Sequence, residues 1–196
     1  MSHPGLSIQL FISTQCSHCS QAIKLLTEAV KQGQIHQLSI TNLDSNTISD
    51  SYSHIRSVPF IQIENFEFTG SLSQADIDEW LNAQKEGLFA NYYFSSQLMD
   101  GNISKVESII KRNPVNWLDL IKLASNSETK MQVRIGITSI FETLSSEIIQ
   151  SSIGNKIINA LINAIESTTQ AIRTDLIYLL SLVYIATNNQ KQTKAS

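Results

Sequence analysis

The chain has 196 residues, of which 42% are hydrophobic, and this composition is typical of a soluble globular protein with one domain or two small ones. No apolar run reaches the roughly 20 residues that cross a bilayer, so we expect no membrane partner. The first residues, Met1–Gly5, lack the basic region of a signal peptide, and we therefore expect a cytoplasmic protein. The net charge of −3 is too small to indicate a nucleic-acid partner.

The charge differs between the two parts of the chain. Residues 1–88 carry four Lys and Arg against nine Asp and Glu, whereas residues 89–196 carry ten against eight. The hydrophobic pattern changes at the same place, so we predict a domain boundary near residues 86–90. The expected division is an α/β domain at 1–86, an α-helical domain at 87–186 and a disordered polar tail at 187–196.

The first part alternates between strand and helix patterns. In chain order we predict a strand at 6–12, a helix at 17–32 ending at Gly33, a strand at 36–42, a short helix at Ser49–His54, strands at 60–63 and 66–69 joined by a turn at Glu64–Asn65, and a last helix capped by Ser71 or Ser73. Ser73 and Asp76 have the spacing of a capping box. A right-handed crossover makes the first two strands parallel, so the hairpin completes a four-stranded mixed sheet.

The two cysteines of the chain both lie in the motif Cys16-Ser17-His18-Cys19, between the first strand and the first helix. Two thiols three residues apart at the start of a helix can close a disulfide and reopen it. A helix N-terminus also stabilises a thiolate on the first cysteine. In a cytoplasmic protein such a pair is more often redox-active or metal-bound than structural.

A CxxC motif after the first strand, an X-Pro pair about 40 residues later and a terminal hairpin with a helix together resemble the thioredoxin superfamily over about residues 5–84. The stretch His54–Pro59 is similar to that family's approach to its cis-proline. The resemblance implies a thioredoxin-like α/β fold, with Cys16 as the nucleophile and Cys19 as the more buried, resolving thiol. It also implies a cis Pro59 and a Val58 backbone that pairs with a substrate beside the dithiol.

Ser17 and His18 occupy the two positions that tune the redox potential in this superfamily. Histidine before the second cysteine resembles the periplasmic oxidants of the DsbA type. A partly protonated imidazole would favour the Cys16 thiolate, and we therefore predict a motif more oxidising than that of thioredoxin. The alternative is that His18 is only an exposed polar residue.

The motif also departs from the known families. Leu10 stands where many thioredoxins have a buried carboxylate, and Thr14-Gln15 stands where they have a tryptophan. The residues before the motif and after the hairpin also lack the glutaredoxin pattern. We therefore expect no glutathione site and no cofactor.

Residues 90–186 show helical patterns throughout, and two segments are similar at an offset of 39 residues. Val133, Ile137, Ile140, Phe141 and Leu144 correspond to Ile172, Leu176, Leu179, Leu180 and Val183, and Arg134 corresponds to Arg173. A two-helix unit repeated at about 40 residues resembles HEAT or armadillo repeats. The alternative is that any two amphipathic helices of a bundle share this pattern.

Other functions have less support. One CxxC supplies two thiolates where structural zinc takes four ligands, and His3, His36 and His54 add no ligand spacing, so we expect no metal.

We predict a thiol-disulfide oxidoreductase acting on protein or small-molecule disulfides, with the helical domain selecting a protein partner. The alternative is a non-enzymatic adaptor, in which Phe89, Tyr92, Tyr93 and Phe94 form an exposed recognition patch or, instead, pack inside the protein. Arg134 and Arg173 either reach a partner or brace adjacent helices or a loop.

Overall fold

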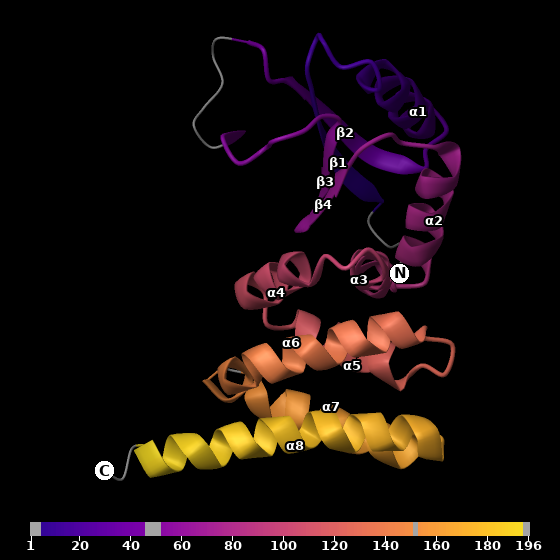
Figure 1. Ribbon diagram of the computed structural model, residues 1–196. Coiled ribbons are helices and arrows are strands. Elements are labelled where there is room, and N and C mark those ends of the chain that lie inside the picture. The colour runs from indigo at the N-terminus through magenta and orange to yellow at the C-terminus, as the bar shows by residue number, and fades with distance from the viewer. Residues whose placement is uncertain (1–4, 46–51, 151–152, 194–196) are drawn as a thin grey trace. The chain divides into compact units, whose positions relative to one another are not determined.

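The computed structural model describes residues 5–45, 52–150 and 153–193 (Figure 1). The chain divides into two compact units, Met1–Phe89 and Ala90–Ser196. The first unit contains a four-stranded sheet with helices, and every described element of the second unit is a helix.

The sheet of the first unit has the strand order β2-β1-β3-β4. Its elements are β1 (Leu6–Ile12), α1 (Cys19–Lys31), β2 (Ile35–Asn42), β3 (Phe60–Ile63), β4 (Phe66–Thr69) and α2 (Gln74–Lys85). Strand β1 runs parallel to β2 and antiparallel to β3, and β3 pairs antiparallel with β4. The predicted mixed sheet with its terminal hairpin and helix is confirmed.

One face of the sheet is apolar, because the strand register places hydrophobic residues opposite one another. Leu10 pairs with Ile61, and Ile61 pairs with Phe68. The ring of Phe68 lies 4.6 Å from that of Trp80 on α2, so α2 packs on this face. Helix α1 lies on the same side of the sheet (Figure 1).

The opposite face of the sheet is polar over most of its width. Ser7, Gln9, Gln37, Ser39, Gln62 and Glu64 line a shallow hollow of about 250 Å³ on it. At the carboxyl end of β1 the face becomes aromatic. There the Phe11 ring lies 4.9 Å from Tyr52 and 5.7 Å from Phe60. These contacts anchor the chain on both sides of Val58–Pro59 to the end of β1, where the cysteine motif begins.

The ends of the two helices follow local rules. After α1, Gly33 has φ +70°, its N–H bonds the Val30 carbonyl, and the Gln34 N–H bonds the Ala29 carbonyl. Before α2, the Ser73 hydroxyl accepts from the Asp76 N–H, while the Asp76 carboxylate accepts from the Ser73 N–H. The predicted stop at Gly33 and the capping box are both confirmed.

Two predicted boundaries need comment. Helix α1 begins at Cys19, two residues later than predicted, because residues Cys16–Cys19 first form a separate backbone turn. Cys19 is therefore the first residue of the helix. The first half of the short helix predicted at Ser49–His54 lies outside the described residues, and residues 52–54 form a turn.

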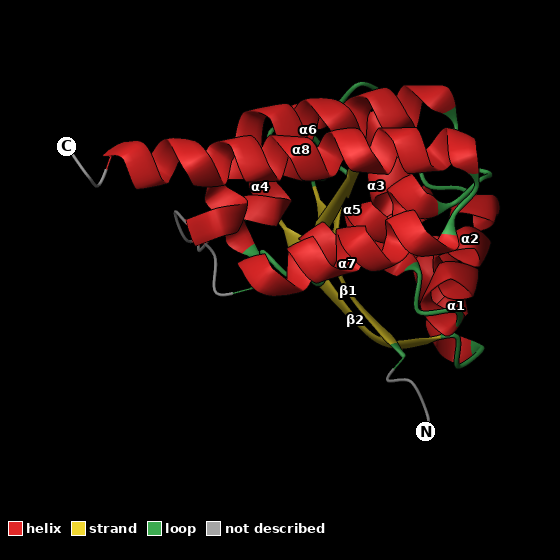
Figure 2. Cartoon of the chain, turned by 90° about the horizontal axis from the view of Figure 1, so that it is seen from below, coloured by secondary structure: helices red, strands yellow, loops and turns green. Residues whose placement is uncertain are grey.

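Most helices of the second unit pack against more than one neighbour. Its elements are α3 (Phe89–Met99), α4 (Ile103–Arg112), α5 (Asn116–Ser125), α6 (Met131–Gln150), α7 (Gly154–Ser167) and α8 (Gln170–Thr193). Helix α6 runs alongside α8 (Figure 2), and α5 contacts α7. Between α5 and α6, the Trp117 ring packs edge-on against Phe141 at 4.7 Å. The unit is helical as predicted, while its HEAT-like character stays a prediction.

The two arginines related by 39 residues make equivalent contacts. Arg134 donates to the backbone carbonyls of Ala124, Asn126 and Thr129, which end α5 and lead into α6. Arg173 donates to the carbonyls of Ile165 and Thr168, which occupy the same place between α7 and α8. The prediction that these arginines brace neighbouring helices is confirmed.

Two features of the second half bear on the predictions. Phe89, Tyr93 and Phe94 are buried, which favours the alternative that the aromatic cluster packs inside the protein over an exposed recognition patch. Helix α8 runs to Thr193, past the predicted end of the helical domain at residue 186, while the disorder of the tail stays a prediction. The last turns contain Gln and Lys and neither Gly nor Pro, so the helix continues despite their polarity.

Candidate active site

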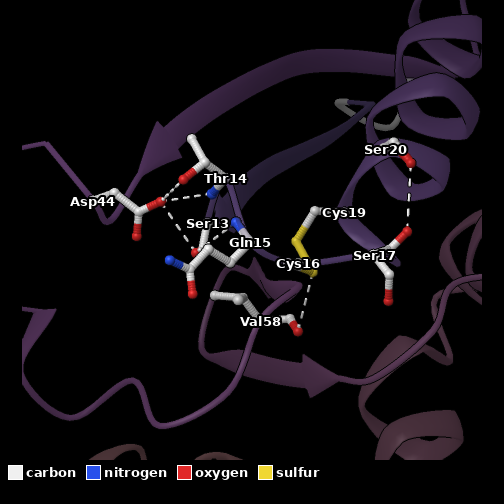
Figure 3. Close-up of a disulfide and its surroundings, with 9 residues drawn as sticks. All are labelled: Ser13, Thr14, Gln15, Cys16, Ser17, Cys19, Ser20, Asp44 and Val58. Atoms are coloured by element: carbon white, nitrogen blue, oxygen red, sulfur yellow. Dashed lines mark hydrogen bonds between the residues drawn. A yellow bond between two sulfur atoms is a disulfide. The ribbon is translucent and has the colours of Figure 1, made fainter.

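Cys16 and Cys19 form a disulfide between the end of β1 and the start of α1 (Figure 3). Their Cα atoms lie 5.4 Å apart. Three residues separate the last residue of β1, Ile12, from Cys16, and α1 begins at Cys19 itself. The pair therefore lies at the carboxyl end of β1, where this strand gives way to the N-terminus of a helix.

Two consecutive backbone turns set this geometry. The Cys16 N–H donates to the Ser13 carbonyl at 3.2 Å, and the Cys19 N–H donates to the Cys16 carbonyl at 3.3 Å. The first helical hydrogen bond follows, from the Ala22 N–H to the His18 carbonyl at 3.2 Å. The second turn spans the two cysteines, so the local backbone brings their side chains close together.

The two sulfur-bearing residues differ in exposure. Cys19 is 3% exposed, whereas Cys16 is partly exposed, and Ser17 and His18 between them are exposed. A disulfide of this kind can be attacked from solvent at Cys16, while Cys19 is shielded. Thiol-disulfide exchange depends on which sulfur is accessible, so this asymmetry favours Cys16 as the site of attack.

The segment before β3 completes the site from the other side. The Val58–Pro59 peptide bond is cis, and the Val58 carbonyl oxygen lies 3.5 Å from the Cys16 sulfur. Pro59 is buried and Val58 is partly exposed. In the reduced protein the Cys16 thiol has an acceptor at this carbonyl. The structure thus brings together Cys16, Cys19, Val58 and Pro59, which are distant in sequence.

His18 is placed beside the disulfide but makes no capping bond. It is the N-cap residue of α1, with φ −88° and ψ −15°, and its side chain makes no capping hydrogen bond to the helix. The effect of His18 on the Cys16 thiolate stays a prediction. Among the described residues, no group of three His, Cys, Asp or Glu side chains could hold a metal ion.

Sequence reasoning missed Asp44, which contacts the loop before Cys16. One carboxylate oxygen of Asp44 accepts hydrogen bonds from the Ser13 hydroxyl at 3.1 Å, from the Thr14 N–H at 2.6 Å and from the Thr14 hydroxyl. These bonds, chiefly those from Thr14, lower the pKa of the exposed Asp44 carboxyl below its ordinary value. A signal existed, since parallel strands β1 and β2 end at one edge of the sheet and Asp44 follows β2 by two residues.

Comparison with known proteins agrees with this geometry. Residues 6–82 match the family model described as the thioredoxin domain. No curated protein matches the chain. None of the helices in the described part of the chain has the length and hydropathy to cross a membrane. Residues 6–82, with the Cys16–Cys19 pair after their first strand, therefore form a thioredoxin-like domain.

Proposed function

We propose that the first unit catalyses thiol-disulfide exchange through Cys16 and Cys19. The observation that carries this proposal is a pair of cysteines three positions apart at a helix N-terminus, of which Cys16 is partly exposed and lies 3.5 Å from the Val58 carbonyl, while Cys19 is buried. A disulfide that only stabilised the fold would not need one sulfur open to solvent. The match of residues 6–82 to the thioredoxin domain supports the same function.

The proposed reaction has two steps, written here for the reduced protein. The Cys16 thiolate attacks one sulfur of a substrate disulfide, which forms a mixed disulfide and releases the other substrate sulfur as a thiolate. The Cys19 thiol then loses its proton to solvent or to the released thiolate and attacks the Cys16 sulfur. The second substrate thiolate leaves, so two electrons pass from the protein dithiol to the substrate disulfide. The reverse sequence oxidises a substrate dithiol.

The surroundings of Cys16 support its role as the attacking thiolate. The first N–H groups of α1 carry the positive end of the helix dipole, which favours a negative charge on a nearby sulfur. The polar Ser17 and His18 leave this end of the helix open to water and to substrate. We infer that the Val58 backbone, which already contacts the Cys16 sulfur, borders the substrate during exchange.

Trapping of the mixed disulfide tests the proposal. Reduced Cys19→Ser protein is mixed with a disulfide-bonded test peptide and analysed by mass spectrometry without reductant. We expect a covalent adduct at Cys16, because the resolving thiol is missing. Cys16→Ser is the matched control and should form far less adduct, since its remaining thiol is buried. Equal adduct in the two variants, or none in either, would contradict the proposal.

The role of the helical unit is a second proposal, namely that Ala90–Ser196 binds the protein whose disulfide is exchanged. Stacked helices such as α6 and α8 form extended surfaces of the kind that repeat proteins use for binding. An adaptor without enzymatic activity would retain its partner in both Cys16→Ser and Cys19→Ser. An enzyme would lose turnover in both, which separates the two alternatives.

A further inference from the structure

The loop between β1 and Cys16 is fixed by a single side chain from another part of the sheet. We propose that Asp44 is a positioning residue of the redox site, which holds the segment Ser13–Gln15 so that Cys16 stays next to Cys19. Its hydrogen bonds span 30 and 31 residues of sequence, from the end of β2 to the loop after β1. This inference rests on the proposed exchange activity and extends it to a residue outside the CxxC motif.

The hydrogen bonds of the loop form a connected set that starts at Asp44. The N–H groups of three consecutive residues before the helix all have acceptors: Thr14 donates to Asp44, Gln15 donates to the Ser13 hydroxyl oxygen at 3.3 Å, and Cys16 donates to the Ser13 carbonyl. The Ser13 hydroxyl in turn donates a hydrogen bond to the Asp44 carboxylate. Two of these three backbone groups therefore depend on the Asp44 carboxylate, directly or through one hydroxyl.

Asp44 acts at a distance from the sulfur atoms. In Figure 3 the carboxylate lies on one side of the Ser13–Gln15 segment and the disulfide lies on the other side. Asp44 therefore has no direct part in the transfer of electrons. Its effect passes through the backbone of the loop, which ends at Cys16.

By holding the loop, Asp44 raises the effective concentration of the Cys16 thiol at the Cys19 thiol. Closure of the disulfide requires the Cys16 and Cys19 sulfurs to meet, and a loop that already holds Cys16 in place reduces the entropy lost on closure. If the loop regains conformational freedom in the reduced protein, closure becomes less favourable. Asp44 thus stabilises the disulfide form relative to the dithiol form.

The test is the equilibrium constant for disulfide formation, measured with the full chain in graded dithiothreitol buffers. Fixing one residue's backbone corresponds to at least about 1 kcal/mol, so Asp44→Ala should lower this constant by about fivefold or more. Asp44→Asn keeps an oxygen that can accept from Thr14 and should retain most of the wild-type value. Asp78→Asn on α2 is the matched control, because it makes the same charge change on an exposed residue that accepts a hydrogen bond from Gln74 in its own helix. Its constant should be unchanged.

The outcomes distinguish this inference from the proposed function. If the wild-type protein shows no reversible dithiol-disulfide couple, the proposed function itself fails. If the wild type is reversible and Asp44→Ala has the same constant, only the role of Asp44 is overturned. A loss in Asp44→Asn as large as in Asp44→Ala would assign the effect to charge and would also contradict the positioning role.

A second variant keeps the test decisive if Asp44→Ala does not fold. Thr14→Val removes one hydroxyl donor to Asp44 and keeps both the Asp44 charge and the Thr14 N–H bond. We expect a smaller decrease in the equilibrium constant, about twofold to threefold, because one of three hydrogen bonds is lost. Far-UV circular dichroism should show unchanged secondary structure in this variant. An unchanged equilibrium constant in Thr14→Val would count against the connected set of bonds.

Discussion

Arg134 offers the sharpest test of how the helical unit is held together. Its side chain is 14% exposed, and it donates to three backbone carbonyls at the α5–α6 connection. These carbonyls lie at or just after a helix C-terminus, where the helix itself supplies no donors. Replacement of Arg134 by Ala therefore removes a donor from each of the three carbonyls, although the Asn126 carbonyl keeps the Thr129 N–H as a second donor.

The expected loss follows from the number of bonds and their exposure. A hydrogen bond from a charged donor contributes about 1.5–3 kcal/mol, but water can reach the freed carbonyls in part, so we expect Arg134→Ala to lower the free energy of unfolding by about 2–4 kcal/mol. The ion pair with Asp175 at 3.5 Å adds little, since Asp175 is half exposed. Arg173 is the matched control, because it is exposed and makes two such bonds. Arg173→Ala should cost about 1 kcal/mol.

Urea unfolding measures both losses in the unit that contains these residues. The chain has two tryptophans, Trp80 in the first unit and Trp117 in the second, so a Trp80→Phe background reports the helical unit through Trp117 alone. Arg134→Lys keeps a positive charge near Asp175 but loses the planar guanidinium group with its several donors. Most of the decrease in unfolding free energy seen in Arg134→Ala should therefore persist. A cost below about 1 kcal/mol for Arg134→Ala, or one no larger than that of Arg173→Ala, would refute this reasoning.

Three further predictions concern the first unit. Ser73→Ala should lower the free energy of unfolding by about 1 kcal/mol because it removes the cap of α2, whereas Ser71→Ala should stay close to wild type; equal effects in urea unfolding would contradict the assignment of the cap. Because its hydrogen bonds lower the pKa of Asp44 in the folded state, Asp44 stabilises the fold at pH values above its unfolded pKa, and this contribution is lost as the pH falls through the lower folded pKa. The difference in unfolding free energy between wild type and Asp44→Asn should therefore shrink from pH 7 towards pH 2, and a constant difference would argue against it. In the reduced protein, iodoacetamide should modify Cys16 well before Cys19, because Cys19 is buried; peptide mapping that found equal rates would contradict this asymmetry.

The elements of the first unit could be predicted because their signals are local. Alternation in β1, the turn at Glu64–Asn65 and the capping box of Ser73 and Asp76 each involve neighbouring residues. The cysteine motif was found for the same reason. The cis form of Val58–Pro59 depended on resemblance to a family, since most X-Pro bonds are trans.

The parts that sequence reasoning missed depend on contacts between distant residues. Asp44 lies in a polar stretch with no motif, and only the parallel pairing of β1 with β2 brings it to Thr14. The delayed start of α1 reflects the turn through Ser17 and His18, which no propensity distinguishes from a first helical turn. The extension of α8 to Thr193 shows that polar composition alone does not end a helix.

The reduction potential of the Cys16–Cys19 pair tests the central claim most directly. The purified protein is equilibrated in graded glutathione or dithiothreitol buffers, and the fractions of dithiol and disulfide are counted after acid quenching and alkylation. We predict a reversible two-electron couple between about −120 and −270 mV, the range of dedicated exchange proteins, and on the oxidising side of thioredoxin. A pair that never closes, or a disulfide too stable to be reduced in these buffers, would contradict the account.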